Sequence, residues 1–246
     1  MHFTDQRDYA VRFETGQQGL LALLHGEVSH VVIIDVLSFS TCVDVAVARG
    51  AEIIPYRWRD ETAQEFARSR AALLAGGPDS PYSLVAESLA TVPRGTRLVL
   101  PSPNGSTLAH MAAERAQVIA GCLRNAAAVS AFLREQEGPV AIIAAGERWG
   151  DGTLRASLED LLGAGAIIDG LEGTRSPEAE AAGALYRTLA PRIPELLHAC
   201  SSGRELIEKG HPGNVALAAE LNVSSCVPLQ QDGRFAPAYR AKEAVR

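Results

Sequence analysis

The sequence lacks the short motifs that identify several large classes of enzyme. It contains no Gly-x-Ser-x-Gly elbow, no Walker-type phosphate loop and no Gly-x-Gly-x-x-Gly turn after a strand. Its histidines show no paired spacing, and His211, in a His-Pro-Gly loop, is the best placed of them for a functional role. Serine hydrolase, nucleoside triphosphatase and dinucleotide-binding functions therefore lack their key residues.

Cysteine is scarce and scattered. The four cysteines lie far apart in apolar surroundings and form no Cys-x-x-Cys pair; they are Cys42, Cys122, Cys200 and Cys226. This pattern excludes a structural zinc site and a disulfide framework, and it predicts reduced core residues of a cytosolic protein.

Aromatic residues, basic charge and long apolar runs are also scarce. Aromatics make up 5% of the chain, and 23 Lys and Arg against 29 Asp and Glu give a formal net charge of −6. Without a basic stripe, nucleic acid is not an expected partner, so local groups must attract any anionic substrate. No run reaches the length of a membrane span and the first residues lack a signal sequence, so we expect a cytoplasmic protein without membrane contact.

What the sequence does contain is an alternation of apolar β-runs and helical patterns. Over 246 residues that are 47% hydrophobic, this rhythm predicts an α/β fold, with a largely parallel sheet flanked by helices and a more helical C-terminal part. We expect a single α/β domain over residues 1–246, or two tightly packed lobes over about 1–173 and 174–246. Short edge strands are predicted after Val227, and the Ala-rich helices are compatible with a homodimer as well as with a monomer core.

The element boundaries follow from these patterns. Strands are predicted at Val31–Val36, Glu52–Tyr56, Arg97–Leu100, Val118–Gly121 and Val140–Ala145. Helices are predicted at about Gly16–His25, Ser40–Arg49, Glu61–Leu74, Ser106–Ala116, Ala126–Gln136, Leu158–Gly163 and Glu178–Leu189.

The first candidate functional segment is the end of the strand Val31–Val36. Asp35 lies in an almost continuous apolar run, where an unpaired carboxylate would be costly to desolvate. It is therefore either a local cap for the helix that follows or a group held ready for a metal. The hydroxyls of Ser38, Ser40 and Thr41 follow at the start of that helix, where exposed N–H groups favour an anion.

The second candidate segment follows the strand Arg97–Leu100. Asn104-Gly105 is a turn pair that tolerates positive φ, and Ser106 or Thr107 can cap the next helix. This loop offers amides and hydroxyls to a phosphate. Because capping and anion binding use the same groups, a well-capped junction with no ligand is the alternative.

Carboxylates gather after a third strand, Val140–Ala145. Glu147 and Asp151 follow it, and Glu159 and Asp160 enter the next helix. Adjacent helical residues point about 100° apart, so one of Glu159 and Asp160 is expected to face the site and the other not. The alternative is that both acids only complement the positive end of the helix dipole.

A further cation candidate lies in the C-terminal part. Ser201-Ser202-Gly203-Arg204 indicates a helix break that carries a positive charge. Arg204 is predicted to contact an anion, and the alternative is an arginine on a solvated helix face.

Together these segments resemble, in the same order, the 2-phosphosulfolactate phosphatase family. The resemblance runs from about His30 to Pro228. It is carried by HVVIIDVLSFSTCVDVAVARGAEIIP, SPNGST, AAGERWGDGTLRASLEDLLGAGAII, SSGRELIEKG and VALAAELNVSSCVPL. It implies a magnesium-dependent hydrolase that releases phosphate from 2-phospho-3-sulfolactate, a small anionic phosphorylated substrate.

The resemblance also implies site residues. The positions that match the family's motifs are Asp35, Asn104, Gly105, Thr107, Glu159 and Asp160. We expect Mg²⁺ to be held by Asp35 with Glu159 or Asp160, these acids forming the catalytic centre, and the Asn104–Thr107 turn to bind the phosphoryl oxygens. Either a water molecule or a carboxylate such as Asp35 is the nucleophile.

Three departures from the family pattern bear on the substrate. Ser38 stands where relatives commonly have Arg, and Asn214 stands where an Asp is expected. The sequence GGPDSPYSLVAESL replaces a Gly-Asn-Ser-Pro segment. The alternatives are therefore a phosphatase for another small phosphorylated hydroxy acid, or a relative that binds anions without catalysis.

Overall fold

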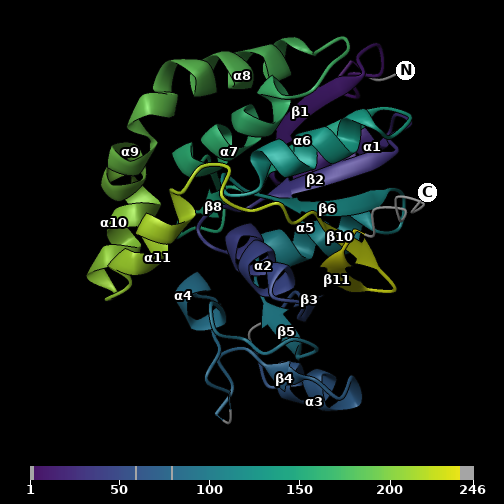
Figure 1. Ribbon diagram of the computed structural model, residues 1–246. Coiled ribbons are helices and arrows are strands. Elements are labelled where there is room, and N and C mark those ends of the chain that lie inside the picture. Colours follow the sequence, from purple (N-terminus) through teal and green to yellow (C-terminus); the bar gives the residue numbers. More distant parts are fainter. Residues whose placement is uncertain (1–2, 59, 79, 239–246) are drawn as a thin grey trace, which may run out of the picture.

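The computed structural model describes residues 3–58, 60–78 and 80–238 (Figure 1). Its centre is a mixed sheet of nine strands within these residues, in the order β1-β7-β2-β6-β10-β11-β3-β5-β4. The strands are β1 (Val11–Thr15), β2 (His30–Ile34), β3 (Glu52–Tyr56), β4 (Leu73–Leu74), β5 (Arg97–Pro101), β6 (Gln117–Gly121), β7 (Val140–Ala144), β10 (Pro228–Gln231) and β11 (Arg234–Pro237). A separate short hairpin pairs β8 (Glu147–Arg148) with β9 (Leu154–Arg155).

Most of the sheet is parallel, but in two groups. The strands β1, β7, β2 and β6 run parallel to one another, and so do β3, β5 and β4. The hairpin β10–β11 joins the groups and is antiparallel to both β6 and β3. Three successive antiparallel pairings reverse the direction of β3, β5 and β4 relative to β2. The segments that follow β2 and β5 nevertheless meet, since the N–H of Gly105 donates to Asp35 Oδ2 at 2.9 Å. This fold confirms the predicted α/β class.

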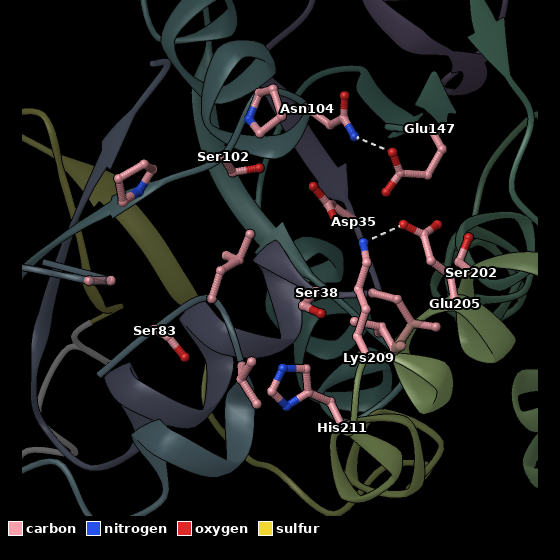
Figure 2. Close-up of a pocket in the computed structure, with 18 of the residues that line it drawn as sticks. Asp35, Ser38, Ser83, Ser102, Asn104, Glu147, Ser202, Glu205, Lys209 and His211 are labelled. Carbon is pink, nitrogen blue, oxygen red and sulfur yellow. Dashed lines mark hydrogen bonds and ion pairs between the residues drawn. The ribbon is translucent and has the colours of Figure 1, made fainter. Parts of the chain in front are cut away.

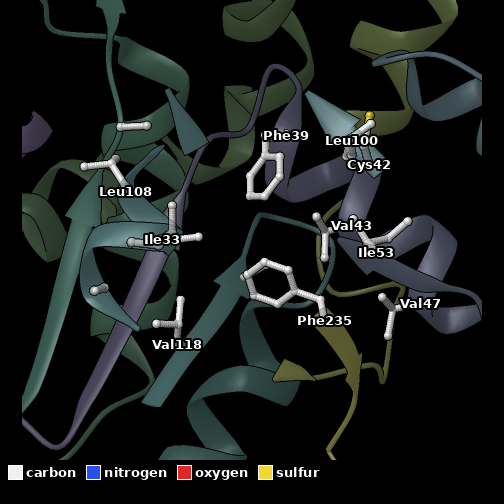
Figure 3. Packing of buried hydrophobic residues seen from close by; sticks show 14 of the residues in the cluster. Ile33, Phe39, Cys42, Val43, Val47, Ile53, Leu100, Leu108, Val118 and Phe235 are labelled. Atoms are coloured by element: carbon white, nitrogen blue, oxygen red, sulfur yellow. The ribbon is translucent and has the colours of Figure 1, made fainter. Parts of the chain in front are cut away.

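The predicted position of the last two strands is wrong. They lie in the middle of the sheet and not at its edge, because Leu229 pairs with Ile119 and Phe235 pairs with Ile53. Phe235 is fully buried and packs edge-on against the ring of Phe39, with the two ring centroids 6.1 Å apart (Figure 3). The hairpin therefore carries core side chains that an edge strand would leave half exposed.

Helices cover both faces of the sheet. The described helices are α1 (Gly16–Leu24), α2 (Phe39–Ala48), α3 (Thr62–Ser69), α4 (Ala86–Leu89), α5 (Gly105–Ala112), α6 (Ala126–Arg134), α7 (Leu158–Asp169), α8 (Pro177–Leu189), α9 (Ile193–Ala199), α10 (Ser201–Glu208) and α11 (Pro212–Ala218), with a 3₁₀ turn at Ala190–Arg192. Val31 and Ile33 of β2 face a core shared with α1, α2 and α5, whereas Val32 and Ile34 face a core shared with α6, α7 and α8. In Figure 1 the chain from α8 to α11 forms an arc beside α7, which agrees with the predicted helical C-terminal part. None of the described helices is long and apolar enough to cross a bilayer.

Two predicted elements differ in the structure. The predicted helix Glu61–Leu74 ends at Ser69, and Leu73–Leu74 forms the edge strand β4. The strand β1 was not predicted, because Arg12 and Glu14 interrupt its apolar pattern. Arg12 is nevertheless buried, since its guanidinium donates to the carbonyls of Tyr9, Glu27 and Arg7. Tertiary hydrogen bonds thus satisfy a charge that marks an exposed segment in the sequence.

The helix α7 is packed on two sides. A Cβ on Gly163 would lie 2.8 Å from Val36, on the sheet side, and a Cβ on Gly165 would lie 2.3 Å from the carbonyl oxygen of Ala182 in α8. The two glycines therefore allow close approach to both neighbours. Because of this double packing, α7 is buried over most of its circumference.

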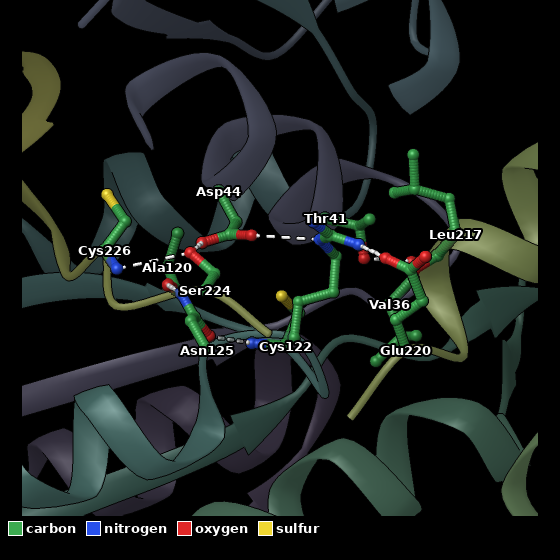
Figure 4. A network of polar contacts seen from close by, with 11 residues as sticks. Val36, Thr41, Asp44, Ala120, Cys122, Asn125, Leu217, Glu220, Ser224 and Cys226 are labelled. Carbon is green, nitrogen blue, oxygen red and sulfur yellow. Dashed lines mark hydrogen bonds and ion pairs between the residues drawn. The ribbon is translucent and has the colours of Figure 1, made fainter. Parts of the chain in front are cut away.

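A buried polar network attaches the segment between α11 and β10, through Ser224, to Asp44 of α2 (Figure 4). Asp44 is fully buried, its Oδ2 accepts from Arg124 Nε at 3.2 Å, and its Oδ1 accepts from Ser224 Oγ at 2.6 Å. Burial raises the pKa of Asp44, although the Ser224 hydroxyl and the Arg124 charge oppose the increase. Arg124 also pairs with Glu220 and donates to the carbonyl of Leu217, so one side chain links three segments.

Candidate functional site

A cavity of about 640 Å³ lies where the carboxyl ends of β2 and β5 approach each other (Figure 2). The segments after both strands line it, together with β8, α10 and the loop before α11. Its polar lining includes Asp35, Ser38, Ser102, Asn104, Glu147, Ser202, Glu205, Lys209 and His211. Two of the three predicted strand-end segments thus meet here, and the third contributes Glu147.

Asp35 lies directly after β2 and lines the cavity while being only 6% exposed. Its Oδ1 accepts the N–H of Phe39 at 3.1 Å and its Oδ2 accepts the N–H of Gly105 at 2.9 Å. Burial raises the pKa of Asp35 to about 7, and the negative charge of Glu147 adds to the increase in spite of these two donors. Asp35 therefore caps the helix α2, as one of the two interpretations predicted, and it also faces the cavity.

Glu147 is the second carboxylate on this wall. It lies in β8, and its Oε2 accepts from Asn104 Nδ2 at 3.0 Å. Burial raises its pKa, and the Asn104 amide and the Arg155 charge oppose the increase. Asn104 therefore orients an acid from another segment. The sequence showed Glu147 as one acid in a cluster after the third strand, but nothing local distinguished it from Asp151, which is exposed.

Asp160 lies behind this wall and does not line the cavity. Its Oδ1 accepts the N–H of Val36 and its Oδ2 accepts the N–H of Gly146, both at 2.8 Å. These donors follow Asp35 and precede Glu147, so Asp160 fixes the two segments that carry the cavity carboxylates. Burial raises its pKa well above the ordinary value, with further contributions from the charges of Glu159 and Asp35.

The expectation that only one of Glu159 and Asp160 faces inward is wrong. Their exposed fractions are 2% and 4%, because α7 is covered by the sheet on one side and by α8 on another. Glu159 contacts the thiol of Cys200, whose pKa is raised to about 12 by burial and then by the Glu159 charge. Glu159 does not line the cavity either.

The hydroxyls predicted to bind an anion are largely used within the fold. Ser40 Oγ donates to the carbonyl of Asp35 at 2.8 Å, and Thr41 Oγ1 donates to that of Val36 at 2.7 Å. Ser106 Oγ donates to the carbonyl of Leu100 at 3.0 Å. These three side chains and Thr107 are buried and are not among the residues that line the cavity.

Gly105 is required for space and not for backbone freedom. Its φ is not positive, unlike the turn geometry expected from an Asn-Gly pair. A Cβ there would lie 2.2 Å from Cδ1 of the buried Phe39 ring and 2.8 Å from Asp35 Oδ2. The glycine therefore lets the start of α5 approach Asp35 closely enough for its N–H to bond the carboxylate.

The structure brings two family departures, Ser38 and Asn214, into direct contact. Asn214 Nδ2 lies 2.7 Å from Ser38 Oγ, and Asn214 Oδ1 accepts the N–H of Ala86 at 2.7 Å. Ala86 lies in the segment that stands in place of the family's Gly-Asn-Ser-Pro. Asn214 thus connects the other two departures, of which Ser38 and the residues Ser83, Leu84 and Val85 line the cavity.

Arg204 is exposed on α10 and is not among the residues that line the cavity. Lys209 and His211, which follow the same helix, do line it, and Lys209 Nζ lies 2.5 Å from Glu205 Oε1. The available signal for Lys209 was a cation at a helix end before Gly210, which is typical of any helix terminus. The structure therefore places Lys209, and not the predicted Arg204, in the cavity lining.

The carboxylates on the cavity wall suit a hard cation. No group of three or more His, Cys, Asp or Glu side chains in the described part of the chain converges as a metal site. Asp35 and Glu147, however, offer only oxygen donors, and their like charges raise the pKa of Asp35. Mg²⁺ is usually held by one or two carboxylates with substrate oxygens and water. The donors at this wall fit Mg²⁺, whereas Glu159 and Asp160 lie behind it.

The fold and the cavity define an α/β protein with a polar strand-end cavity, whose lining includes the carboxylates of Asp35 and Glu147 and the cation of Lys209. The family model described as 2-phosphosulpholactate phosphatase matches residues 22–233, and the chain belongs to this family.

Curated relatives agree with this assignment. The 2-phosphosulfolactate phosphatase of Methanothermobacter thermautotrophicus is 28% identical over 208 residues, which cover 83% of this chain and 88% of the relative. A protein of Symbiobacterium thermophilum named "Probable 2-phosphosulfolactate phosphatase" is 29% identical over 219 residues, with coverage of 82% and 91%. One of the same name from Carboxydothermus hydrogenoformans is 29% identical over 223 residues, with coverage of 87% and 92%.

Proposed function

We propose that this protein hydrolyses 2-phospho-3-sulfolactate to 3-sulfolactate and phosphate in a Mg²⁺-dependent reaction. The observation that carries the proposal is the pairing of Asp35 with Glu147 on one wall of a cavity that Lys209 and His211 also line. Family membership supplies the reaction class. The cavity supplies carboxylates that can hold a cation for the phosphoryl group and a lysine that can pair with an anionic group.

The carboxylate wall is the proposed site of the phosphoryl group. Asp35 and Glu147 would hold Mg²⁺, which supplies neutralisation of the negative charge that develops on phosphoryl oxygens. Asn104 keeps Glu147 oriented through its amide, and Asp160 holds the segments of both acids in place. Because backbone N–H groups fix Asp35, its direction does not depend on a bound ligand.

Lys209 and the groups near it are the proposed site of the acid part of the substrate, its carboxylate and sulfonate. Lys209 is a compact cation whose ion pair with Glu205 is exposed, so it can turn to an incoming anion at small cost. Ser38 and His211 add polar groups on the same side of the cavity. A substrate that is negative at both ends would thus place its phosphoryl group at the cation held by Asp35 and Glu147, and its acid part at Lys209, Ser38 and His211.

Phosphate release from 2-phospho-3-sulfolactate, with Mg²⁺ and with chelator, tests the proposal. A panel with 2-phospholactate and other phosphorylated hydroxy acids belongs in the same experiment, because Ser38 and Asn214 form a neutral pair where the family pattern has charges. We expect metal-dependent release from the sulfonated ester. Release only from another ester would identify that ester as the substrate in place of 2-phospho-3-sulfolactate. No release from any ester would refute a phosphatase function.

A matched pair of variants on one helical segment tests the role of Lys209. We expect Lys209→Met to raise KM by about tenfold or more, since an ion pair with the substrate is lost, and to leave kcat within a few-fold. Arg204→Met is the control, because Arg204 is exposed outside the cavity lining. A KM increase in the Arg204 variant alone would restore the arginine as the anion contact and refute this part of the proposal.

A further inference from the structure

We propose that Asn214 is a positioning residue that turns the hydroxyl of Ser38 into a hydrogen-bond donor for the acid part of the substrate. This inference rests on the proposed function and adds a specificity determinant to it. Asn214 is not among the residues that line the cavity, so it would act only through Ser38.

The direction of the hydrogen bonds follows from the chemistry of the groups. The N–H of Ala86 can only donate, so the Asn214 atom 2.7 Å from it is the amide oxygen. The other amide atom is then the nitrogen, which also only donates, and Ser38 Oγ at 2.7 Å must accept from it. The hydroxyl hydrogen of Ser38 is consequently free for another partner.

The hydroxyl hydrogen of Ser38 can be donated into the cavity. Ser38 lines the cavity, and among the described residues no acceptor for its hydroxyl is recorded. Figure 2 shows Ser38 between Asp35 and His211, on the side of the cavity away from Asn104 and Glu147. A donor at this position suits a carboxylate or sulfonate oxygen, while the phosphoryl group lies against the carboxylate wall.

The arrangement is rigid enough to fix the hydroxyl before the substrate binds. Asn214 is fully buried in the first turn of α11, and Ser38 is 6% exposed. The helix α11 approaches α4 so closely that a Cβ on Gly213 would lie 1.9 Å from Glu87 Oε1. Because three segments hold the amide, its orientation is preorganised and costs little entropy on binding.

Asn214→Asp inverts the polarity of this contact with almost no change of shape. The carboxylate still accepts the N–H of Ala86, but its second oxygen cannot donate, so Ser38 must donate to it and present only lone pairs to the cavity. We expect the Kd for 3-sulfolactate and the KM for the phosphorylated substrate to rise by about tenfold to one-hundredfold, with kcat within a few-fold of wild type.

A double-mutant cycle separates this role from a purely structural one. The wild type, Ser38→Ala, Asn214→Asp and the double variant are compared by calorimetric titration with 3-sulfolactate, with Ser38→Thr as the variant that keeps the hydroxyl. We expect Asn214→Asp to weaken binding at least several-fold less in the Ser38→Ala background, and Ser38→Thr to retain most of the affinity. Equal effects in both backgrounds would overturn the proposal, because Asn214 would then act by charge or by structure alone.

The titration also keeps this inference distinct from the proposed function. Phosphate release by the wild type is measured in parallel, and its absence would refute the phosphatase while the binding cycle still tested Ser38. Release by the wild type together with independent effects of the two substitutions would refute the positioning role only. Failure of the wild type to bind 3-sulfolactate at millimolar concentration would refute the positioning role as well.

Discussion

Replacing Asp35 with asparagine should abolish turnover and yet leave the metal-free protein at least as stable as the wild type above neutral pH. Asp35 is buried, and its ionised form is disfavoured by burial and by the charge of Glu147. Asparagine removes that charge and retains the shape. The carboxylate that would hold Mg²⁺ thus weakens the fold when no cation is bound.

The magnitude follows from the pKa of Asp35. A rise from the ordinary value of 3.8 to about 7 corresponds to a cost of about 4 kcal/mol for the ionised folded state at pH 8. In the variant, the asparagine oxygen accepts from either Phe39 or Gly105, and its nitrogen faces the other N–H, which costs about 1 to 3 kcal/mol. The net expectation is a stabilisation of roughly 1 to 3 kcal/mol.

The pH dependence has a definite sign. The folded state keeps the proton of Asp35 to a higher pH than the unfolded chain, so the unfolded chain binds fewer protons between about pH 4 and pH 7. The contribution of Asp35 to stability is therefore complete below pH 3.8 and is lost as the pH rises through about 7. Between about pH 5 and about pH 8, the wild type should lose roughly 2 to 3 kcal/mol relative to the variant.

Urea unfolding of both proteins in chelator, near pH 5 and near pH 8, measures this difference. The difference between the two proteins measures the titration of Asp35 together with the part of the Asp160 pKa shift that the Asp35 charge causes, and both contributions have the same sign. Addition of Mg²⁺ near pH 8 should raise the midpoint of the wild type only, because the ligand is missing in the variant. A variant that is less stable than the wild type near pH 8 in chelator would refute the reasoning, as would wild-type turnover in the variant.

Two further substitutions test the surroundings of the site. Gly105→Ala should destabilise the protein by about 1 to 3 kcal/mol and greatly lower kcat. The new Cβ would lie 2.2 Å from the Phe39 ring and would displace the N–H that holds Asp35. Urea unfolding and phosphate release measure the two effects, and an unchanged kcat would contradict the prediction. Arg124→Met should cost about 3 kcal/mol or more near neutral pH, since it leaves Asp44 buried without its cation; thermal unfolding measures the loss, and Asp44→Asn in the same background should recover part of it.

Local sequence signals located the walls of the cavity. An acid inside an apolar run predicted a special role for Asp35, and a Pro-bounded Asn-Gly turn after a strand predicted a role for Asn104 and Gly105. Both signals are local, since they rest on what an isolated strand and its end can accommodate. The structure places Asp35 and Asn104 in the cavity lining and Gly105 in contact with Asp35.

Other features depend on contacts that no local pattern records. Asp160 acts by accepting the N–H groups of Val36 and Gly146. Val36 and Asp160 are 124 residues apart in the sequence. Asn214 and Ser38 are 176 residues apart. The prediction that only one of Glu159 and Asp160 faces inward failed because it assumed that α7 has a single buried face. Gly163 and Gly165 allow two faces of α7 to pack against neighbouring elements.

The opposed halves of the sheet give the site its chemical character. In an all-parallel sheet the carboxyl ends of neighbouring strands form one open edge, and a ligand there meets loops from one side. Here the hairpin β10–β11 reverses the direction of β3 and β5 relative to β2, and the segments after β5 and β2 meet at the cavity from strands of opposite direction. Gly105 can then donate to Asp35 across the junction, and Asn104 can donate to Glu147. The buried Asp35 and the half-buried Glu147 consequently share this junction, and the Glu147 charge adds to the raised pKa of Asp35, at a cost in stability that a bound cation would remove.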